Sequence, residues 1–393
     1  MKVLILDTDY PDFLAWLYAQ HEGMELQPYA EQLRLRQESL YGVADFYACN
    51  LRKLGHEAYD IYPNNSFLQT AWAREHGVKV EGSPVGSGSA SPLWRRAKDL
   101  LSEASPQQLG SYLRRWYRGA HTFRCRYDIL MAQVRYHKPD VLLNQAVVDL
   151  PSQFLKEARP YVRFMVGQHA ATQLPEDLDL GVYDLMISSF PPTLEYFKRK
   201  GARARLSRLG FEPGVLSALG PGNRTWGISF VGSFFNVHSS RAKFVESVCQ
   251  RVPQFRIWSG NLSALPPHSP LHGHYMGHAW GPNMYRVLQS SKITFNHHGD
   301  VAPYANNMRL FEATGVGTCL LTDWKENLKE MFEPGKEVLT YRSPDECAEL
   351  IQYYLDHEEE RQAIGLAGQT RTLREHTYYL RMQEFVSMVG AHV

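Results

Sequence analysis

Short apolar runs that end in polar or glycine-containing loops recur along the chain, and segments of helical periodicity separate them. In the first half these runs are KVLILD at 2–7, KPDVLLNQ at 138–145, YVRFMVG at 161–167 and YDLMISS at 183–189. Continuous apolar runs are typical of strands in a parallel sheet, and parallel strands need helical crossovers. The pattern therefore predicts an α/β fold with a doubly wound sheet.

A second series of the same kind follows a Gly- and Pro-rich stretch at 210–225. Its apolar runs are GISFVGS at 227–233, FRIWSG at 255–260 and KITFNHH at 292–298, and the stretch 344–376 has helical character. Two successive Rossmann-like domains would place the carboxyl ends of both sets of strands at a shared cleft. Ligands bind at this edge in open α/β sheets.

Length and composition agree with this reading and exclude several classes of protein. A chain of 393 residues is long enough for two domains. The formal net charge of +1 gives no overall attraction to nucleic acid or to membranes, so we expect neither as a partner. The odd number of scattered cysteines argues against a disulfide framework and a zinc site; they are Cys49, Cys125, Cys249, Cys319 and Cys347.

The N-terminus and the hydropathy pattern indicate where such a protein works. The apolar run at 2–6 meets acidic residues at once, which is unlike a signal peptide, and no run reaches the roughly 18 apolar residues of a membrane span. We therefore expect a cytoplasmic protein without a transmembrane segment. The Gly/Ser-rich stretch at 82–92 favours a mobile surface loop, with a lid over the cleft as the alternative.

The stretch NNMRLFEATGVGTCLLTD at 306–323 is the strongest candidate for a binding site. Asn306 or Asn307 can cap a helix that begins near Met308, and the free N–H groups of a helix start attract phosphate. Arg309 adds a planar cation, and Glu312, one turn later, can accept both hydroxyls of a ribose. The alternative is an ordinary Arg–Glu ion pair on the helix surface.

Two glycine-containing loops are weaker candidates for the same ligand. In FVGSFFNVHSSR, Gly232 and Ser233 would let the backbone approach a diphosphate, with Arg241 at the start of the next helix. An ordinary turn between strand and helix explains this motif as well. In HYMGHAWG, Gly277 and His278 could lie near a nucleotide base, although aromatic core packing is an equal alternative.

The candidates for acid–base chemistry lie after strands of the first half. His169 follows the run at 161–167, and Asp9 follows the run at 2–7, so both are candidate acceptor-side bases. A hydrogen-bonded loop histidine and a helix-capping aspartate are the alternatives. The pair His297 and His298 makes a poor metal chelate, because adjacent side chains on a strand point to opposite faces. We therefore expect no metal site.

The C-terminal residues resemble those of the CgeB-like (spore maturation protein type) glycosyltransferases. The resemblance rests on an N-x-R-x-F-E core with a following glycine, an LFEPGKE-like segment, a YYL helix and a terminal HTY. In this sequence those elements are Asn307, Arg309, Phe311–Glu312, Gly317, Asp323, Phe332–Glu337, Tyr353–Leu355 and His376–Tyr378. The match is specific over about 290–382, is weaker back to about 183, and gives little for the first 180 residues.

The resemblance implies a GT-B fold, in which two Rossmann-like domains bind a nucleotide-activated sugar between them. It implies an acceptor-side domain at 1–213, a linker at 214–225, a donor-binding domain at 226–376 and a C-terminal helix at 377–393 that packs back on the first domain. Glu312 would then bind the donor ribose. Asn307 and Arg309 would hold the diphosphate, Gly232 and Ser233 would lie below it, and His278 would lie near the base.

The expected activity is transfer of a sugar from a nucleoside diphosphate donor to an acceptor hydroxyl, by a hexosyltransferase-type enzyme. The donor would be UDP-, GDP- or dTDP-linked, no cofactor or metal is expected, and the acceptor stays open. Tyr304 stands where many retaining enzymes of this fold carry a second glutamate, so the stereochemical outcome is open too. The alternatives are a nucleotide-sugar epimerase of the same fold and a non-catalytic sugar-nucleotide-binding protein.

Overall fold

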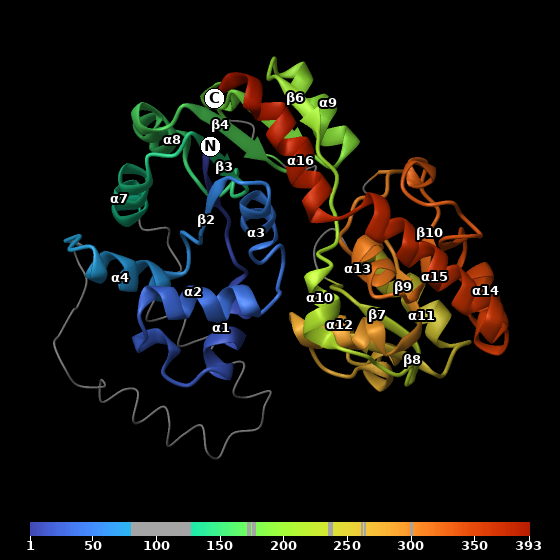
Figure 1. Ribbon diagram of the computed structural model, residues 1–393. Helices are drawn as coiled ribbons and strands as arrows, with labels where there is room; N and C mark the ends of the chain where they lie inside the picture. Colours follow the sequence, from blue (N-terminus) through green and yellow to red (C-terminus); the bar gives the residue numbers. More distant parts are fainter. Residues whose placement is uncertain are drawn as a thin grey trace.

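The computed structural model describes residues 1–79, 127–170, 174, 178–234, 239–260, 262, 265–298 and 302–393. The expected loop at 82–92 lies outside these residues. The described chain forms two lobes, each built on its own parallel sheet with helices packed around it (Figure 1).

The first sheet contains the strands expected from the apolar runs of the first half. In the described residues its order is β2-β1-β3-β4-β5-β6, and every neighbouring pair is parallel. Every residue of β3 and β5 is buried, as the continuous apolar runs predict for central strands covered on both faces. The strands are β1 (Lys2–Leu6), β2 (Glu57–Ile61), β3 (Val141–Asn144), β4 (Phe164–Gln168), β5 (Leu185–Ser188) and β6 (Ala204–Leu206).

Helices connect these strands and carry apolar residues into the two cores beside the sheet. Ala48 and Leu51 of α3 pack with Val3 and Val141 on one face, whereas Phe154 and Leu155 of α8 belong to the cluster on the other. The helices of this half are α1 (Pro11–Gln20), α2 (Tyr29–Glu38), α3 (Phe46–Lys53), α4 (Ser66–Glu75), α7 (Tyr127–His137), α8 (Ser152–Ala158) and α9 (Pro191–Arg199).

The second sheet has the order β11-β10-β9-β7-β8 in the described residues, again with parallel pairs. Its strands are β7 (Trp226–Val231), β8 (Phe255–Trp258), β9 (Ser291–Asn296), β10 (Cys319–Asp323) and β11 (Leu339–Tyr341). Its helices are α11 (Ser239–Cys249), α12 (Pro282–Gln289), α13 (Arg309–Gly315), α14 (Pro344–Asp356) and α15 (Glu358–Glu375).

The helical stretch expected at 344–376 is interrupted at one residue. His357 has φ −101° and ψ 76°, which separates α14 from α15. Three glutamates, Glu358 to Glu360, form the first turn of α15. Negative side chains favour a helix N-terminus, so the sequence itself supports a new helix start at this point.

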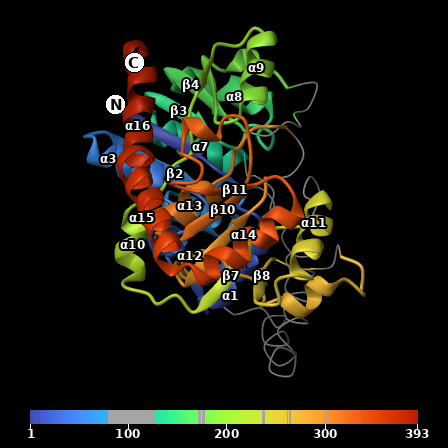
Figure 2. The same cartoon turned by 90° about the vertical axis from the view of Figure 1, so that its right-hand side faces the viewer.

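Two segments cross between the lobes and pair with each other. Phe211 donates its N–H to the carbonyl of His376 (2.8 Å), and Tyr378 donates to the carbonyl of Phe211 (3.0 Å). After the first crossing, α10 (Gly214–Leu219) packs on α12; after the second, α16 (Tyr378–Val389) packs on α3 of the first lobe (Figure 1). Figure 2 shows α15 and α16 following one another along one side of the molecule.

No helix among the described residues is long and apolar enough to cross a membrane.

Candidate active site between the two sheets

Helix α13 begins beside the carboxyl end of β9, and two asparagines fix the loop before it. Oδ1 of Asn307 accepts a hydrogen bond from the N–H of Leu310 (3.3 Å), and its Nδ2 donates to Oδ1 of Asn296 in β9 (2.9 Å). Asn307 therefore provides the expected side-chain cap. Asn306 points elsewhere, because its Nδ2 donates to the carbonyl of Ala170 in the first lobe (3.3 Å).

Arg309 and Glu312 contact each other within this helix. Nη1 of Arg309 lies 2.8 Å from Oε2 of Glu312, and the two side chains are only 14% and 7% exposed. Burial raises the pKa of Glu312, whereas Arg309 and a hydrogen bond with Tyr285 act in the opposite direction. The ion-pair alternative is thus the observed geometry, but the pair is buried rather than on the surface.

The loop after β7 is held by Arg241. The N–H of Gly232 donates to the carbonyl of Trp258 (3.0 Å). Nη1 of Arg241 donates to the carbonyl of Ser233 (2.9 Å), and its Nη2 donates to the carbonyl of His297. Burial lowers the pKa of Arg241 to about 10. Arg241 therefore braces the backbone of two loops at the carboxyl edge of the second sheet.

The loop before α12 contacts the first lobe through a tryptophan. The ring of Trp280 lies edge-on to that of Tyr41, with centroids 5.1 Å apart. Gly277, in the same loop, has φ 99°, and its carbonyl accepts a hydrogen bond from the N–H of Ser259 (3.0 Å). His278 is exposed. The loop that was expected near a nucleotide base therefore also forms part of the contact between the lobes.

His169 follows β4 at the boundary between the lobes, next to the residue that Asn306 contacts. Its N–H donates to the carbonyl of Ile187 (3.1 Å), which fixes the backbone. Its Nε2 is buried and has no hydrogen-bond partner among the described residues. Burial lowers the pKa of His169, so the imidazole is neutral near pH 7 and can accept a proton.

Asp9 requires a correction to the expectation of a catalytic base. Its two carboxylate oxygens accept hydrogen bonds from Nε and Nη2 of Arg36, at 2.9 and 2.6 Å. Both side chains of this pair are 1% exposed. A carboxylate whose oxygens are both held in a buried bidentate pair is unsuited to take a proton from an acceptor. The geometry assigns Asp9 a structural role.

Asp7, two residues earlier, is a titratable group that the sequence did not single out from its neighbours. It directly follows β1, and its Oδ1 accepts from the N–H of Thr8 (2.8 Å). Burial and the nearby charge of Asp9 raise its pKa to about 7. The position after a strand was visible in the sequence, but the burial that shifts the pKa was not.

The two histidines after β9, His297 and His298, contact different partners, as the alternation of side chains along a strand predicts. Nδ1 of His297 lies 2.9 Å from the hydroxyl of Tyr341 in the core, whereas Nδ1 of His298 lies 2.7 Å from Oδ1 of Asp323. Among the described residues, no three side chains of His, Cys, Asp or Glu gather in a way that could hold a metal ion. The His298–Asp323 pair was missed at the sequence level, where these histidines were considered only as metal ligands.

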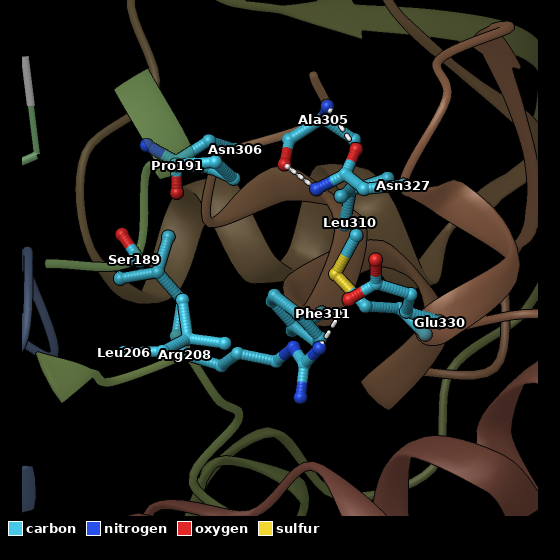
Figure 3. A pocket seen from close by; sticks show the side chains of 12 residues that line it. Ser189, Pro191, Leu206, Arg208, Ala305, Asn306, Leu310, Phe311, Asn327 and Glu330 are labelled. Carbon is cyan, nitrogen blue, oxygen red and sulfur yellow. Dashed lines mark hydrogen bonds and ion pairs between the residues drawn. The ribbon is translucent and has the colours of Figure 1, made fainter. Parts of the chain in front are cut away.

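A narrow pocket lies between the lobes beside α13 (Figure 3). Arg208 points toward Glu330 across it, with Nη2 2.5 Å from Oε2, and Asn327 holds the backbone of Ala305. Neither His169 nor Glu312 lines it. Its walls come from both halves of the chain: Ser189, Pro191, Leu206, Arg208 and Leu209 from the first, and Ala305, Asn306, Leu310, Phe311, Asn327, Glu330 and Met331 from the second.

Comparison with known proteins gives one family match. Residues 241–387 match the family model described as "Glycosyl transferase-like". This segment contains α13, the His298–Asp323 pair and most of the second sheet. No curated protein matches the sequence.

Several solved structures share the arrangement of the whole chain. A glycosyltransferase from Rickettsia africae has a TM-score of 0.55 at 10% identity, over 99% of this chain and 97% of that one. Sucrose-phosphate synthase from Thermosynechococcus elongatus has a TM-score of 0.55 at 12% identity, over the full length of both chains. Anabaena HepE in complex with UDP has a TM-score of 0.52 at 13% identity, also over the full length of both.

At these identities the likeness concerns the fold. The two parallel-sheet domains have glycosyltransferases of the GT-B type as structural neighbours, so the expected fold class is confirmed. The expectation of a glycosyltransferase is confirmed for residues 241–387, which match the glycosyl transferase-like family model.

Proposed function

We propose that this chain is a cytoplasmic, CgeB-like glycosyltransferase of hexosyltransferase type, which moves a sugar from a nucleoside diphosphate to an acceptor hydroxyl. One observation carries the proposal. The loop that caps α13 lies within the glycosyl transferase-like segment and contacts Ala170, the neighbour of His169, in the first lobe. A donor-binding helix and a neutral histidine therefore lie at the same boundary.

On the donor side, we assign the ribose to Glu312. Arg309 holds one of its carboxylate oxygens, so Arg309 acts mainly by positioning Glu312, and its contribution to the diphosphate is secondary. Asn307 holds the start of the helix against β9. The diphosphate would approach the backbone at Gly232 and Ser233, which Arg241 braces, and the base would lie near Gly277 and His278.

On the acceptor side, His169 is the general base. The acceptor hydroxyl would give its proton to Nε2 while its oxygen forms a bond to the anomeric carbon. The bond from that carbon to the diphosphate oxygen breaks as the new bond forms, and the nucleoside diphosphate leaves with the electron pair. A positioned base of this kind contributes on the order of 10²- to 10⁴-fold to rate.

The contact between the lobes suits a reaction that must avoid water. Trp280 of the second lobe packs against Tyr41 and Phe13 of the first, with ring centroids 5.1 and 6.4 Å apart. Excluding water protects an activated donor from hydrolysis. We propose that protein groups, not a metal ion, offset the charge of the leaving diphosphate; turnover that needs Mg²⁺ and stops in EDTA would contradict this.

A nucleotide screen tests the assignment. Solved HepE complexes contain UDP and UDP-glucose, so UDP is the first nucleotide to test, beside GDP and dTDP. Binding of one of them should raise the melting temperature in proportion to the logarithm of its concentration. The matching nucleotide sugar should then release nucleoside diphosphate faster when an acceptor is added. No binding of any of the three would overturn the proposed function.

A further inference from the structure

His298 is a buried histidine with one nitrogen occupied and the other without a partner. Its side chain is 4% exposed, and Nδ1 lies 2.7 Å from Oδ1 of Asp323. The N–H of His298 donates to the same oxygen (3.0 Å). Nε2 is buried and has no hydrogen-bond partner in the part of the chain that the structure describes. Buried polar atoms without partners are uncommon in proteins, so this one calls for an explanation.

The groups around the pair keep Asp323 ionised. Burial alone would raise the pKa of Asp323, but the hydrogen bond from His298 and the charges of His297 and Lys325 hold it well below its usual range. Nζ of Lys325 lies 3.3 Å from Oδ2 of Asp323. With Nδ1 against this carboxylate, an imidazole that also donates to an anion through Nε2 must carry a proton on both nitrogens.

A chain of hydrogen bonds connects this pair to the start of α13. Oγ1 of Thr322 donates to Oδ1 of Asp323 (3.2 Å) and accepts from Nδ2 of Asn296 (3.0 Å). Oδ1 of Asn296 accepts from Nδ2 of Asn307 (2.9 Å), which in turn caps α13. The His298–Asp323 pair and the candidate ribose-binding helix are thus parts of one hydrogen-bonded unit at the carboxyl ends of β9 and β10.

The loop after β7, which Arg241 holds, lies at the same carboxyl edge of the second sheet. Arg241 donates to the carbonyls of both Ser233 and His297, the residue before His298. The loop proposed to meet the diphosphate is therefore tied directly to the strand end that carries His298. A hydrogen-bond donor at this strand end therefore lies next to the loop that we assign to the diphosphate.

We propose that His298, held by Asp323, donates a hydrogen bond from Nε2 to the diphosphate of the sugar donor and stabilises it as it leaves. The inference rests on the proposed function and adds a group to its donor side. When the bond from the anomeric carbon to the diphosphate oxygen breaks, that oxygen takes the electron pair. The new negative charge develops on the oxygens that Nε2 contacts, so the contact strengthens in the transition state. His298 keeps its proton, and the acceptor proton goes to His169.

Two substitutions test the contributions of the two ring nitrogens of His298 separately. In His298→Asn the amide nitrogen takes the place of Nδ1 and keeps the bond to Asp323, but nothing replaces Nε2. In His298→Gln the amide nitrogen lies near the place of Nε2. Titrations with UDP and with uridine, which lacks the diphosphate, give the readout. We expect His298→Asn to lose about tenfold to a hundredfold in UDP affinity and to bind uridine as before, because one charge-assisted hydrogen bond is removed. His298→Gln should lose less.

His56 offers a matched control, since it precedes β2 at the opposite end of the first sheet, with Nδ1 3.4 Å from the amino group of Met1. His56→Asn should bind both ligands normally. Equal losses of UDP and uridine in His298→Asn, or no loss of either, would overturn the inference. If His298→Asn fails to fold, a His298→Gln protein that loses UDP affinity but binds uridine as before supports the inference. A His298→Gln protein that binds both like the wild type, or loses both equally, overturns it. Wild-type protein that binds none of UDP, GDP and dTDP contradicts the proposed function instead.

Discussion

Nη1 of Arg309 lies 2.8 Å from Oε2 of Glu312, one helical turn further on, and both side chains are largely buried at the start of α13. Taking two charges out of water costs free energy that their attraction only partly offsets, so a pair of this kind is weak evidence for stability. It does fix the position of the carboxylate. We therefore attribute the pair to the placement of Glu312 for a ligand, and this attribution can be tested apart from stability.

The first prediction concerns Glu312→Gln. The substitution leaves the guanidinium of Arg309 buried without a counter-ion, so we expect the free energy of unfolding to fall by about 3–5 kcal/mol. We expect UDP affinity to fall more than tenfold as well, because the amide cannot accept both ribose hydroxyls. Urea unfolding and calorimetric titration measure the two effects.

The double variant Arg309→Met, Glu312→Leu separates them. Replacing both members of a buried pair by apolar residues is often neutral or stabilising, so the double variant should regain most of the lost stability. It should not regain UDP binding. A double variant that binds UDP like the wild type would show that the pair serves the fold alone.

The second prediction concerns His169→Gln. We expect kcat to fall by about 10²- to 10⁴-fold with little change in the KM of the donor, because the base acts on the acceptor. Burial lowers the pKa of His169 below its ordinary 6.5, so wild-type kcat/KM should decrease only as the pH falls below about 6.5 and the imidazole becomes protonated. This acidic limb should be missing in the variant. A variant with wild-type turnover would exclude His169 as the base.

The parallel strands could be predicted because each is specified by its own residues. The apolar runs at 2–7, 138–145 and 183–189 contain β1, β3 and β5, and the run at 161–167 covers all of β4 except its last residue. The same local logic gave Asn306 or Asn307 as the cap, of which Asn307 forms it, and predicted that His297 and His298 point to opposite faces. Hydrophobic periodicity and helix capping depend on residues that lie close together in the sequence, so both can be recognised in a single sequence.

Contacts between distant residues could not be predicted in this way. Asp9 is held by Arg36, and His298 by Asp323, through contacts that span 27 and 25 residues. Nothing near Asp9 in the sequence distinguishes a carboxylate that faces a cleft from one in a buried pair. The spacing of Arg309 and Glu312 allowed an ion pair, but their burial depends on how α12 and α15 pack against α13.

The third prediction follows from the pair of Asp9 and Arg36. Asp9→Asn should lower the free energy of unfolding by about 3–5 kcal/mol, because it leaves a buried guanidinium without its carboxylate. At low temperature, where the Asp9→Asn variant stays folded, its kcat should be within about twofold of the wild-type value. Melting curves and initial rates at 10 °C check this. A hundredfold loss of kcat in the folded variant would restore Asp9 as a catalytic candidate.

The fourth prediction uses a close approach of the two lobes at Gly281. Gly281 has φ 52°, and a Cβ at this position would lie 1.8 Å from the carbonyl oxygen of Ser39, at the end of α2. Any side chain therefore forces Ser39 and Gly281 apart, and with them the neighbouring contact of Trp280 with Tyr41. In Gly281→Ala we expect kcat to fall at least tenfold, while UDP, bound to the second lobe, keeps its affinity within about twofold. Small-angle scattering should show a larger radius of gyration.

Gly220 provides the control for backbone strain. Its φ of 68° is also left-handed, but a Cβ there would meet nothing within 4 Å. Gly220→Ala carries the conformational cost of a side chain at positive φ, about 1–3 kcal/mol, without a clash between the lobes. If Gly281→Ala and Gly220→Ala lower turnover equally, strain alone explains the loss. If only Gly281→Ala does so, the approach of Gly281 to Ser39 is part of the arrangement in which the sugar is transferred.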